Sequence, residues 1–284
     1  CWVLGEHNQG TNTVANGPLA GRNLADLRHE YGANLLGTRE VQGLGGRCPL
    51  LIKLLDATDD LSVQVHPSDD YEGLAPGEPG KTEMWYVLGA EPGSQIVYGL
   101  KEGVDRAAFE TAVRAGHTMD CLKKITVQPG DVYYVPAGTI HALGAGVLVA
   151  EVQQSSDTVY RVYDYNRLGL DGKPRELHVE HALKVTNYDT PPKPFRPAPA
   201  PADQWQTLVE SPFFMVERMA LKSAWSGKVN PVSFETILVT AGKGRITWAE
   251  GKLDLAKGDS LLLPASLGDY SLSGEMELVR SYLP

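Results

Sequence analysis

Cysteine, long apolar runs and clusters of positive charge are all scarce in this chain. The three cysteines, Cys1, Cys48 and Cys121, are too few and too far apart for a disulfide framework or a CxxC metal site, so we expect a reducing, cytoplasmic compartment. No window reaches the roughly 18 consecutive apolar residues that a membrane-spanning helix needs. Nor does the sequence open with the basic and apolar segments of a secretory signal. We therefore expect a soluble protein that has no membrane partner.

Acidic residues outnumber basic ones, with 35 Asp and Glu against 26 Lys and Arg and a formal net charge of -9. Nucleic-acid binders present a clustered basic face, and because the sequence shows none, we expect no nucleic-acid partner. An anionic substrate would have to be attracted by a few local cations. The 284 residues, 42% of them hydrophobic, suffice for one large or two ordinary domains without disulfide or metal staples.

Proline is concentrated in residues 191–201, the segment PPKPFRPAPAP. Such a segment cannot pair in a ladder and favours a stiff, extended connector. We therefore predict a first domain at residues 1–190, a proline-rich linker at 191–202 and a second domain at 203–284.

Most of the remaining sequence is typical of β-structure. Short apolar or alternating runs recur between glycine and proline turn signals, among them LLIKLL, LSVQVH, MWYVLG, VYYVPA and ETILVT. This pattern predicts a mainly β protein, built as a sandwich or a barrel. Helices are predicted at 24–31, 105–115 and 176–185, the second with Asp105 as its N-cap and Gly116 as its stop.

One motif occurs twice in the chain. The segment PGDVYYVPAGTIH begins at Pro129, and KGDSLLLPASLGD begins 128 residues later at Lys257. A glycine–aspartate turn, a buried strand and a proline at the strand end suit a barrel hairpin, so the repeat predicts two related barrels. Asp269 in the second copy replaces His141 of the first, and no histidine follows the linker. We therefore expect any histidine-based site in the first domain and interpret the second barrel as degenerate.

Ionisable side chains interrupt two of the predicted strands and follow a third. In the predicted strand LSVQVHP, alternation puts Gln64 and His66 on the same face. In the predicted strand GKTEMWYVL, the same alternation puts Lys81 and Glu83 on one face of that strand. Burial of such groups without partners would be costly. His141 follows a tight turn and begins a further buried run. Two imidazoles and a carboxylate are preferred zinc ligands, and a catalytic zinc site typically has three protein ligands.

Each of these residues also has a structural interpretation. A single histidine on a strand is more often structural than a ligand. Lys81 and Glu83, taken alone, suit a cross-strand ion pair, and Cys48 and Cys121 suit buried thiols. We interpret the other histidines as structural or exposed: His7, His29, His117, His178 and His181. The aromatic residues of the same runs are interpreted as core: Trp85, Tyr133 and Tyr134.

The run PGDVYYVPAGTIH resembles the second motif of the cupin superfamily, although Ala145 stands where that motif has an asparagine. Taken with QVHPSDDYE, GKTEMWYVL, IVYGLKEG, AGTIHALGAG and EVQQSSDTVYRVYDYNR, the chain resembles the type I mannose-6-phosphate isomerases of the short bacterial form. The resemblance extends from Cys1 to Tyr188 and is weaker beyond the linker. It implies two cupin-like jelly-roll barrels with a few short helices, the first catalytic and the second degenerate. Relative to the family the chain starts late, so we expect the first domain to begin before Cys1.

The resemblance also implies a site. Carried over by position, the metal-binding residues of the family fall on Gln64, His66, Glu83 and His141. Its active-site lysine falls on Lys81 and its arginine on Arg161. Asp157 matches an acidic residue proposed in the family for proton transfer, with Glu83 or a water as alternatives. On an extended strand Asp157 and Arg161 would share one face about 13 Å apart, within reach of opposite ends of a hexose phosphate.

The implied function is a zinc-dependent isomerase that interconverts mannose 6-phosphate and fructose 6-phosphate through an enediolate, with one Zn²⁺ per chain. The ion would polarise the sugar oxygens, while Lys81 and Arg161 would stabilise the developing negative charge. The expected partner is a phosphosugar substrate, and we expect a monomer or a homodimer. Two alternatives remain open: a metal-dependent cupin of another chemistry, such as an iron dioxygenase, and a sugar-phosphate-binding cupin without catalytic activity.

Overall fold

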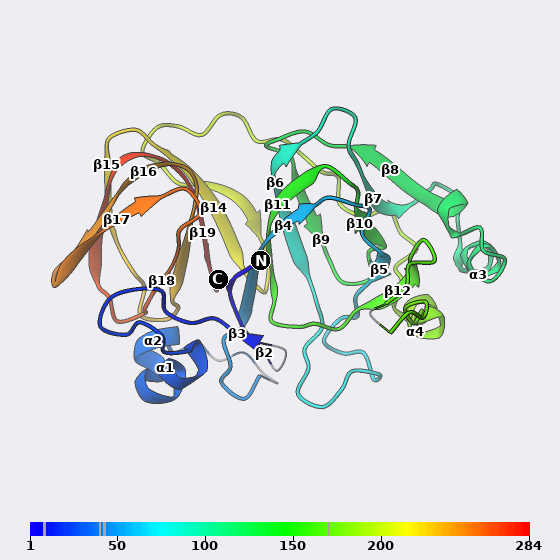
Figure 1. Cartoon of the computed structure of the whole chain (residues 1–284), viewed down its shortest axis with the longest axis horizontal. Coiled ribbons are helices and arrows are strands. Elements are labelled where there is room, and N and C mark those ends of the chain that lie inside the picture. The colour runs from blue at the N-terminus through cyan, green and yellow to red at the C-terminus, as the bar shows by residue number, and fades with distance from the viewer. Residues whose placement is uncertain (8–9, 40, 42–43, 170) are drawn as a thin grey trace. The chain divides into compact units, whose positions relative to one another are not determined.

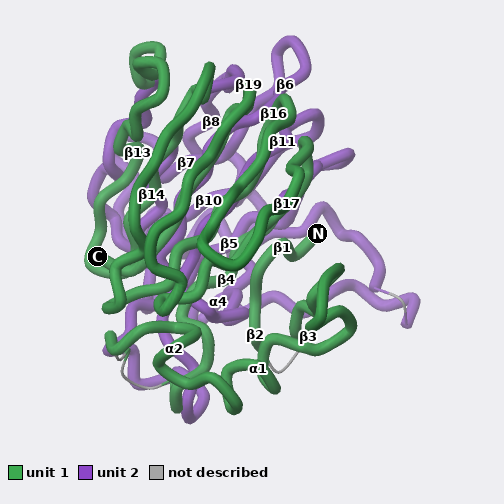
Figure 2. Tube along the Cα trace, turned by 90° about the vertical axis from the view of Figure 1, so that its left-hand side faces the viewer, with its two compact units in different colours: residues 1–53, 197–284 green, residues 54–196 purple. Residues whose placement is uncertain are grey.

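The computed structural model of the chain describes residues 1–284 except residues 8–9, 40, 42–43 and 170. The chain forms two compact units, which Figure 2 colours separately. The N/C unit consists of residues 1–53 and 197–284, and the middle unit consists of residues 54–196. Strands dominate both units, which confirms the mainly β prediction.

Helices are few, and the three predicted ones lie close to their predicted positions. The helices are α1 (Leu24–Tyr31), α2 (Ala33–Leu36), α3 (Arg106–Arg114), α4 (Val179–Val185) and the 3-10 helix η1 (Thr118–Cys121). Of these, α2 and η1 were not predicted. The side chain of Asp105 caps α3 by accepting the backbone N–H of Ala108, as predicted. Helix α4 begins three residues later than predicted, at Val179. No helix in the described part of the chain has the length and apolarity that crossing a membrane requires.

Two antiparallel sheets form the middle unit. Their strands are β4 (Leu50–Ala57), β5 (Val63–Val65), β6 (Glu83–Ala90), β7 (Gln95–Leu100), β8 (Leu122–Thr126), β9 (Val132–Val135), β10 (His141–Leu143), β11 (Val147–Gln154) and β12 (Tyr160–Tyr163). Among these strands, the first sheet has the order β4-β11-β6-β9 and the second has the order β12-β5-β10-β7-β8. Strand β4 begins in the N/C unit and ends in the middle unit.

Each face of the second sheet is covered by a different part of the middle unit. On one face, Tyr98 and Leu143 pack with Trp85 and Tyr133 of the first sheet, which confirms these two aromatic residues as core. On the other face, the sheet packs against α3 and α4 through a set of buried residues that includes Phe109. Figure 1 shows both helices on that outer side of the middle unit. The first face therefore looks into the space between two sheets, where a polar site is shielded from bulk water.

The N/C unit contains the remaining strands. They are β1 (Trp2–Leu4), β2 (Glu6–His7), β3 (Gly10–Thr11), β13 (Gln206–Glu210), β14 (Met215–Leu221), β15 (Ala224–Lys228), β16 (Glu235–Trp248), β17 (Gly251–Ala256), β18 (Ser260–Leu263) and β19 (Asp269–Tyr282). Its main sheet has the order β13-β14-β19-β16-β17, with β15 paired to β19 and β18 paired to β16.

The two longest strands of this sheet bend sharply. Tyr270 pairs with Trp248 at one end of β16, yet its hydroxyl donates at 2.8 Å to Glu235 at the other end. A straight strand would separate the two ends of β16 by roughly 43 Å. The bend lies near Gly242, which has a φ of +80° and whose absent Cβ would lie 2.1 Å from the carbonyl oxygen of Glu275. Glycine therefore lets one pair of strands contribute to both sides of the N/C core.

Residues 1–53 pack with the C-terminal segment, whereas the sequence pattern predicts that they belong to a domain at 1–190. Strand β1 pairs with the part of β4 that belongs to the N/C unit. The last carbonyl groups of a helix have no partner within it. In α2, the carbonyls of residues 34–36 accept backbone N–H groups of Phe234, Ala265 and Ser266. The division between residues 196 and 197 falls inside the predicted proline-rich linker.

The sequence repeat is also a structural repeat. In the middle unit, Val87 donates its N–H to the Asp131 carbonyl at 2.9 Å and accepts from the Gly130 N–H at 2.8 Å. In the N/C unit, Val239 makes the same two hydrogen bonds, both at 2.9 Å, with residues 259 and 258. Both turn glycines have a positive φ, which favours glycine at this position. Asp269, the counterpart of His141, is exposed.

Candidate metal centre

Three buried side chains from three strands of the middle unit converge on one point. His66 directly follows β5, Glu83 begins β6 and His141 begins β10. Their potential ligand atoms all lie within 4.8 Å of one another, and each residue is only 1% exposed. The expected convergence of these three side chains is therefore observed.

Backbone contacts fix the protonation of the two imidazoles. His66 Nδ1 lies 2.8 Å from the Thr158 carbonyl oxygen, and His141 Nδ1 lies 2.8 Å from the Thr139 carbonyl oxygen. Because a carbonyl only accepts, both Nδ1 atoms donate, and each neutral ring keeps its lone pair on Nε2. These Nε2 atoms face Glu83, at 3.6 Å for His66 and 3.3 Å for His141. Burial lowers the pKa of His141, which keeps the ring neutral.

Glu83 and Lys81 form an ion pair inside the same site. Both carboxylate oxygens of Glu83 are buried, and Oε1 has no hydrogen-bond partner among the described residues. Lys81 Nζ lies 2.8 Å from Glu83 Oε2 and 3.0 Å from His66 Nε2. Burial alone would lower the pKa of Lys81, but nearby carboxylates, Glu83 foremost, reverse this effect and raise it. The predicted ion pair is confirmed, but its members are two residues apart on one segment and not on paired strands.

Gln64, His141 and Arg161 lie in one row across the second sheet. Gln64 is directly opposite His141 on β10 and directly opposite Arg161 on β12. Opposed side chains of antiparallel strands point to the same face of a sheet. Gln64 Nε2 also lies 3.4 Å from His141 Nε2. Strand pairing therefore brings Gln64 and Arg161 beside the three converging side chains.

Asp157 lies outside the strand on which it was predicted. It is exposed, in the segment between β11 and β12, and β12 begins only at Tyr160. The expectation that Asp157 and Arg161 share one face of a single strand is therefore wrong. The chain turns after β11 because Gln153 Nε2 donates to the carbonyls of both Gln154 and Ser156 at 2.7 Å. The charge of Asp157 still contributes to raising the pKa of Lys81.

Two family models match parts of the chain. Residues 1–79 match the catalytic domain of type I phosphomannose isomerase, and residues 204–283 match the cupin domain of mannose-6-phosphate isomerase. The whole chain is 38% identical over 286 residues to the mannose-6-phosphate isomerase ManA of Bacillus subtilis, covering 100% of this chain and 89% of the relative. The chain belongs to the type I mannose-6-phosphate isomerase family of enzymes.

Other members of the mannose-6-phosphate isomerase family agree with this assignment. The Streptococcus mutans mannose-6-phosphate isomerase is 38% identical over 288 residues, covering 99% of this chain and 87% of the relative. The crystal structure of the Bacillus subtilis mannose-6-phosphate isomerase superposes with a TM-score of 0.86 at 35% identity, covering 99% of this chain and 88% of that one. The crystal structure of a variant of the Salmonella typhimurium phosphomannose isomerase superposes with a TM-score of 0.74 at 17% identity, covering 99% of this chain and 90% of that one. At this level of identity the similarity supports the fold alone.

In this mannose-6-phosphate isomerase family member, a further buried carboxylate lies beside the converging side chains. Glu151 on β11 is 3% exposed and opposite Trp85, whose indole N–H donates to Glu151 Oε2 at 2.9 Å. The Trp85 ring centroid lies 5.3 Å from that of His141. Glu151 was not among the predicted site residues. An acidic residue inside the apolar run VLVAEV was the available signal, because a buried carboxylate requires partners.

Proposed function

We propose that this protein is a zinc-dependent mannose-6-phosphate isomerase that interconverts mannose 6-phosphate and fructose 6-phosphate through an enediolate. The observation that carries the proposal is the convergence of His66, Glu83 and His141 in a chain of this family. We further propose that the middle unit is the catalytic one, because all of the site residues lie within residues 54–196.

The donor set fits a zinc ion. The Nε2 atoms of both imidazoles face Glu83, and Glu83 Oε1 is buried without a hydrogen bond from a described residue. Lys81 contacts both Glu83 Oε2 and His66 Nε2. A buried carboxylate in this state is costly, and a divalent cation would compensate it. Two histidines and one glutamate are a known ligand set of catalytic zinc. When bound, the ion would supply Lewis-acid stabilisation of negative charge on the sugar oxygens.

We propose Gln64 as a fourth ligand. Its amide nitrogen is 3.4 Å from His141 Nε2, so the amide group reaches the point where the imidazole lone pair is directed. The oxygen and nitrogen of an amide exchange places when the group turns by half a rotation, which would direct Gln64 Oε1 toward the cation. A neutral amide oxygen is a weaker ligand than a carboxylate, so its contribution to affinity should be the smallest of the four.

Lys81 and Arg161 are the proposed cations for an anionic substrate. The chain carries a net charge of -9, so a phosphosugar must be attracted locally. The ammonium group of Lys81 is buried beside Glu83, and Arg161 Nε is buried without a hydrogen-bond partner among the described residues. Fixed donors of this kind stabilise an enediolate oxygen because they need no reorganisation when the negative charge forms.

A carboxylate must move the proton between carbons 2 and 1 of the sugar. We propose Asp157 for this role, because it is exposed and its charge reaches Lys81. Glu83 and Glu151 are the alternatives. Glu83 faces both imidazoles, and Glu151 already accepts the indole N–H of Trp85. Glu83 and Glu151 therefore already contact other groups within the site.

Cytoplasmic placement is part of the proposal. Its support is that all three cysteines are free, with Cys48 and Cys121 buried as interpreted from the sequence. Structural disulfides are rare in reducing compartments.

The deciding experiment is a coupled assay that converts mannose 6-phosphate to fructose 6-phosphate, with metal analysis of the same sample. We expect turnover in proportion to bound zinc and no requirement for oxygen. Absence of isomerisation in a zinc-loaded sample would contradict the proposed function. Product formation that requires oxygen would instead indicate a dioxygenase.

A further inference from the structure

The outer edge of strand β12 is held by one histidine. Strand β12 is the last strand of its sheet, and Arg161 pairs on one side with Gln64 of β5. On the other side, the backbone N–H of His178 donates to the Arg161 carbonyl at 2.7 Å. The backbone N–H of Arg161 donates to Nδ1 of the His178 ring at 3.3 Å. The imidazole thus takes the place of the carbonyl that a neighbouring strand would offer.

The same segment also contacts the guanidinium group of Arg161. Nη1 of Arg161 donates to the backbone carbonyl of Glu176 at 2.8 Å. Residues 176–178 therefore hold Arg161 at three points: the backbone N–H, the backbone carbonyl and one guanidinium nitrogen. Nε of the same side chain is buried and has no hydrogen-bond partner among the described residues. These contacts fix Nη1 of the guanidinium group and leave Nε as a donor without a hydrogen-bond partner among the described residues.

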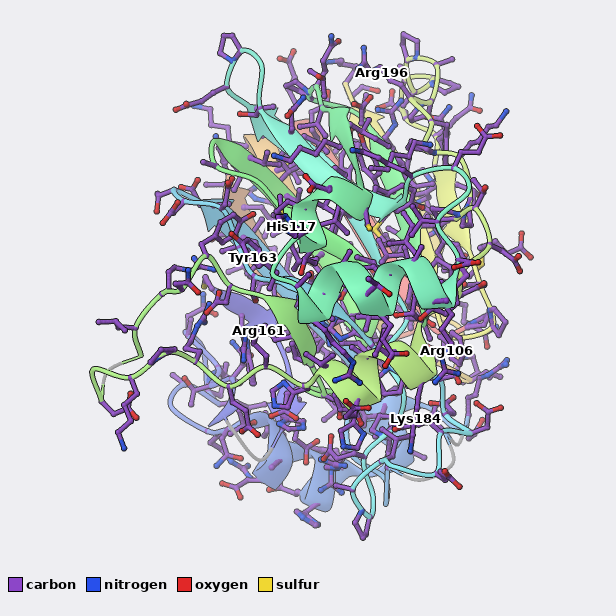
Figure 3. The ribbon with its side chains drawn as sticks, turned by 90° about the vertical axis from the view of Figure 1, so that its right-hand side faces the viewer. Arg106, His117, Arg161, Tyr163, Lys184 and Arg196 are labelled. Atoms are coloured by element: carbon purple, nitrogen blue, oxygen red, sulfur yellow. The ribbon has the colours of Figure 1, made fainter. Side chains whose placement is uncertain are left out.

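The segment between Asp164 and Arg175 forms an arm that leaves β12 and returns to it. An ion pair at the base of this arm brings residues 176–178 to their position beside Arg161. Asp164, which is 4% exposed, accepts hydrogen bonds from the guanidinium groups of Arg167 and Arg175. Leu168 and Pro174 form an isolated bridge between the two sides of the arm. Figure 3 labels Arg161 on β12, beside the point where the arm leaves the strand. The chain then returns to Arg161 and continues into α4.

We propose that His178 is a positioning residue for Arg161, and that its neutral ring acts as the acceptor that holds the edge of β12. The inference rests on the proposed function, since it takes Arg161 to be a group that contacts the substrate. Burial lowers the pKa of His178, and Arg161 and His181 lower it further while Glu176 opposes them, which favours the neutral ring. The ring of His178 is 28% exposed, so its removal does not open a core cavity.

Substitutions that separate the acceptor from the ring test this role. Asparagine carries an oxygen on Cγ, where histidine carries Nδ1, so His178→Asn keeps an acceptor for the Arg161 N–H. His178→Gln moves the acceptor one bond further, and His178→Ala removes it. The matched control is His181→Asn, one turn later on α4. The ring of His181 stacks on Tyr160, with centroids 4.8 Å apart, and contacts the hydroxyl of Tyr71 at 2.8 Å. Within the described part of the chain it forms no hydrogen bond with Arg161.

The measurements are kcat, KM and bound zinc, together with hydrogen exchange of the Arg161 backbone amide. We expect His178→Ala and His178→Gln to lower kcat by about tenfold or more, because a misplacement of about 1 Å is costly in a catalytic site. Zinc content should stay unchanged, and the Arg161 amide should exchange faster. His178→Asn and His181→Asn should retain kcat within about threefold of the wild type and keep the amide protected, because each leaves the Arg161 N–H an acceptor.

Two results would overturn the inference. One is a wild-type kcat in His178→Ala, and the other is an equal loss of kcat in His178→Asn and His178→Ala. Failure of the wild type to isomerise mannose 6-phosphate would refute the proposed function instead. Amide exchange in the same variants would then decide whether His178 holds Arg161.

Discussion

The rings of His66 and His141 lie 4.8 Å apart, and each donates its Nδ1–H to a backbone carbonyl. The Nε2 atom of His66 also lies 3.0 Å from Lys81 Nζ, so that ring is held through both of its nitrogens. Both Nε2 atoms therefore face Glu83 without a change of tautomer. Such preorganisation reduces the cost of ordering the ligands when the metal enters.

Removal of the metal should abolish turnover. A chelator should reduce kcat to background, and added Zn²⁺ should restore it, because the proposed ion supplies stabilisation that no side chain of the site replaces. Circular dichroism before and after chelation checks that the sheets persist. Full activity in a sample shown to be free of metal would contradict a metal-dependent mechanism.

Gln64→Ala should weaken zinc binding by about 10- to 100-fold if the amide is a ligand or holds one in place. The measurement is a competition titration with a chelator of known affinity. Gln95→Ala provides the control, since Gln95 is an exposed amide on β7 of the same sheet. Equal zinc affinity in both variants would remove Gln64 from the metal site.

Arg161→Ala should lower kcat by about 100-fold while leaving the zinc content unchanged, because the proposed role of the guanidinium is to act on the substrate and not on the ion. Arg106→Ala is a suitable comparison, since Arg106 is exposed on α3. Steady-state kinetics with zinc analysis distinguishes the two effects. Unaltered kinetics in Arg161→Ala would exclude this residue from the reaction.

The lowered pKa of His178 predicts a contribution to the pH dependence of stability. Between its lowered pKa and the ordinary value of 6.5, the unfolded state binds more protons than the folded state. The contribution is therefore present above pH 6.5 and is lost as the pH falls below it. Urea unfolding at pH 7.5 and pH 5.5 should show a larger loss of unfolding free energy for the wild type than for His178→Asn. An equal loss in both proteins would contradict the prediction.

Gly242→Ala should destabilise the N/C unit more than Gly258→Ala. Both glycines have a positive φ, which costs an alanine about 1–2 kcal/mol. At Gly242 the added Cβ would also lie 2.1 Å from a backbone carbonyl, whereas at Gly258 nothing lies within 4 Å. Denaturant unfolding of the two variants measures the difference. Equal midpoints would show that the bend in β16 does not depend on Gly242.

Local sequence patterns were sufficient where the determining contacts are themselves local. The capping of α3 by Asp105 and the glycine turns of the repeat depend on neighbours a few residues away, and both were predicted. His66, Glu83 and His141 were also found from the sequence, but through a family resemblance. Alternation within a strand predicts which side chains share a face of that strand. It does not predict which other strand will lie beside that face.

Tertiary structure decided the contacts that depend on which strands pair. The packing of residues 1–53 with the C-terminal segment follows from helix carbonyls that bond to residues 234, 265 and 266, which no local pattern reveals. The position of Asp157 outside β12 depends on a turn held by Gln153.

Glu151 and His178 show the same limit within the site. From the sequence, Glu151 is one acidic residue in an apolar run, and His178 was interpreted as structural or exposed. Their roles appear only when β11 is paired with β6 and when the chain after β12 returns to the edge of that strand. The sequence by itself determined the strand-rich character of the fold and the shared face of side chains such as Gln64 and His66, because these follow from backbone periodicity. The fold decided which residues lie next to each of these faces, because strand pairing brings together residues that are far apart in the chain.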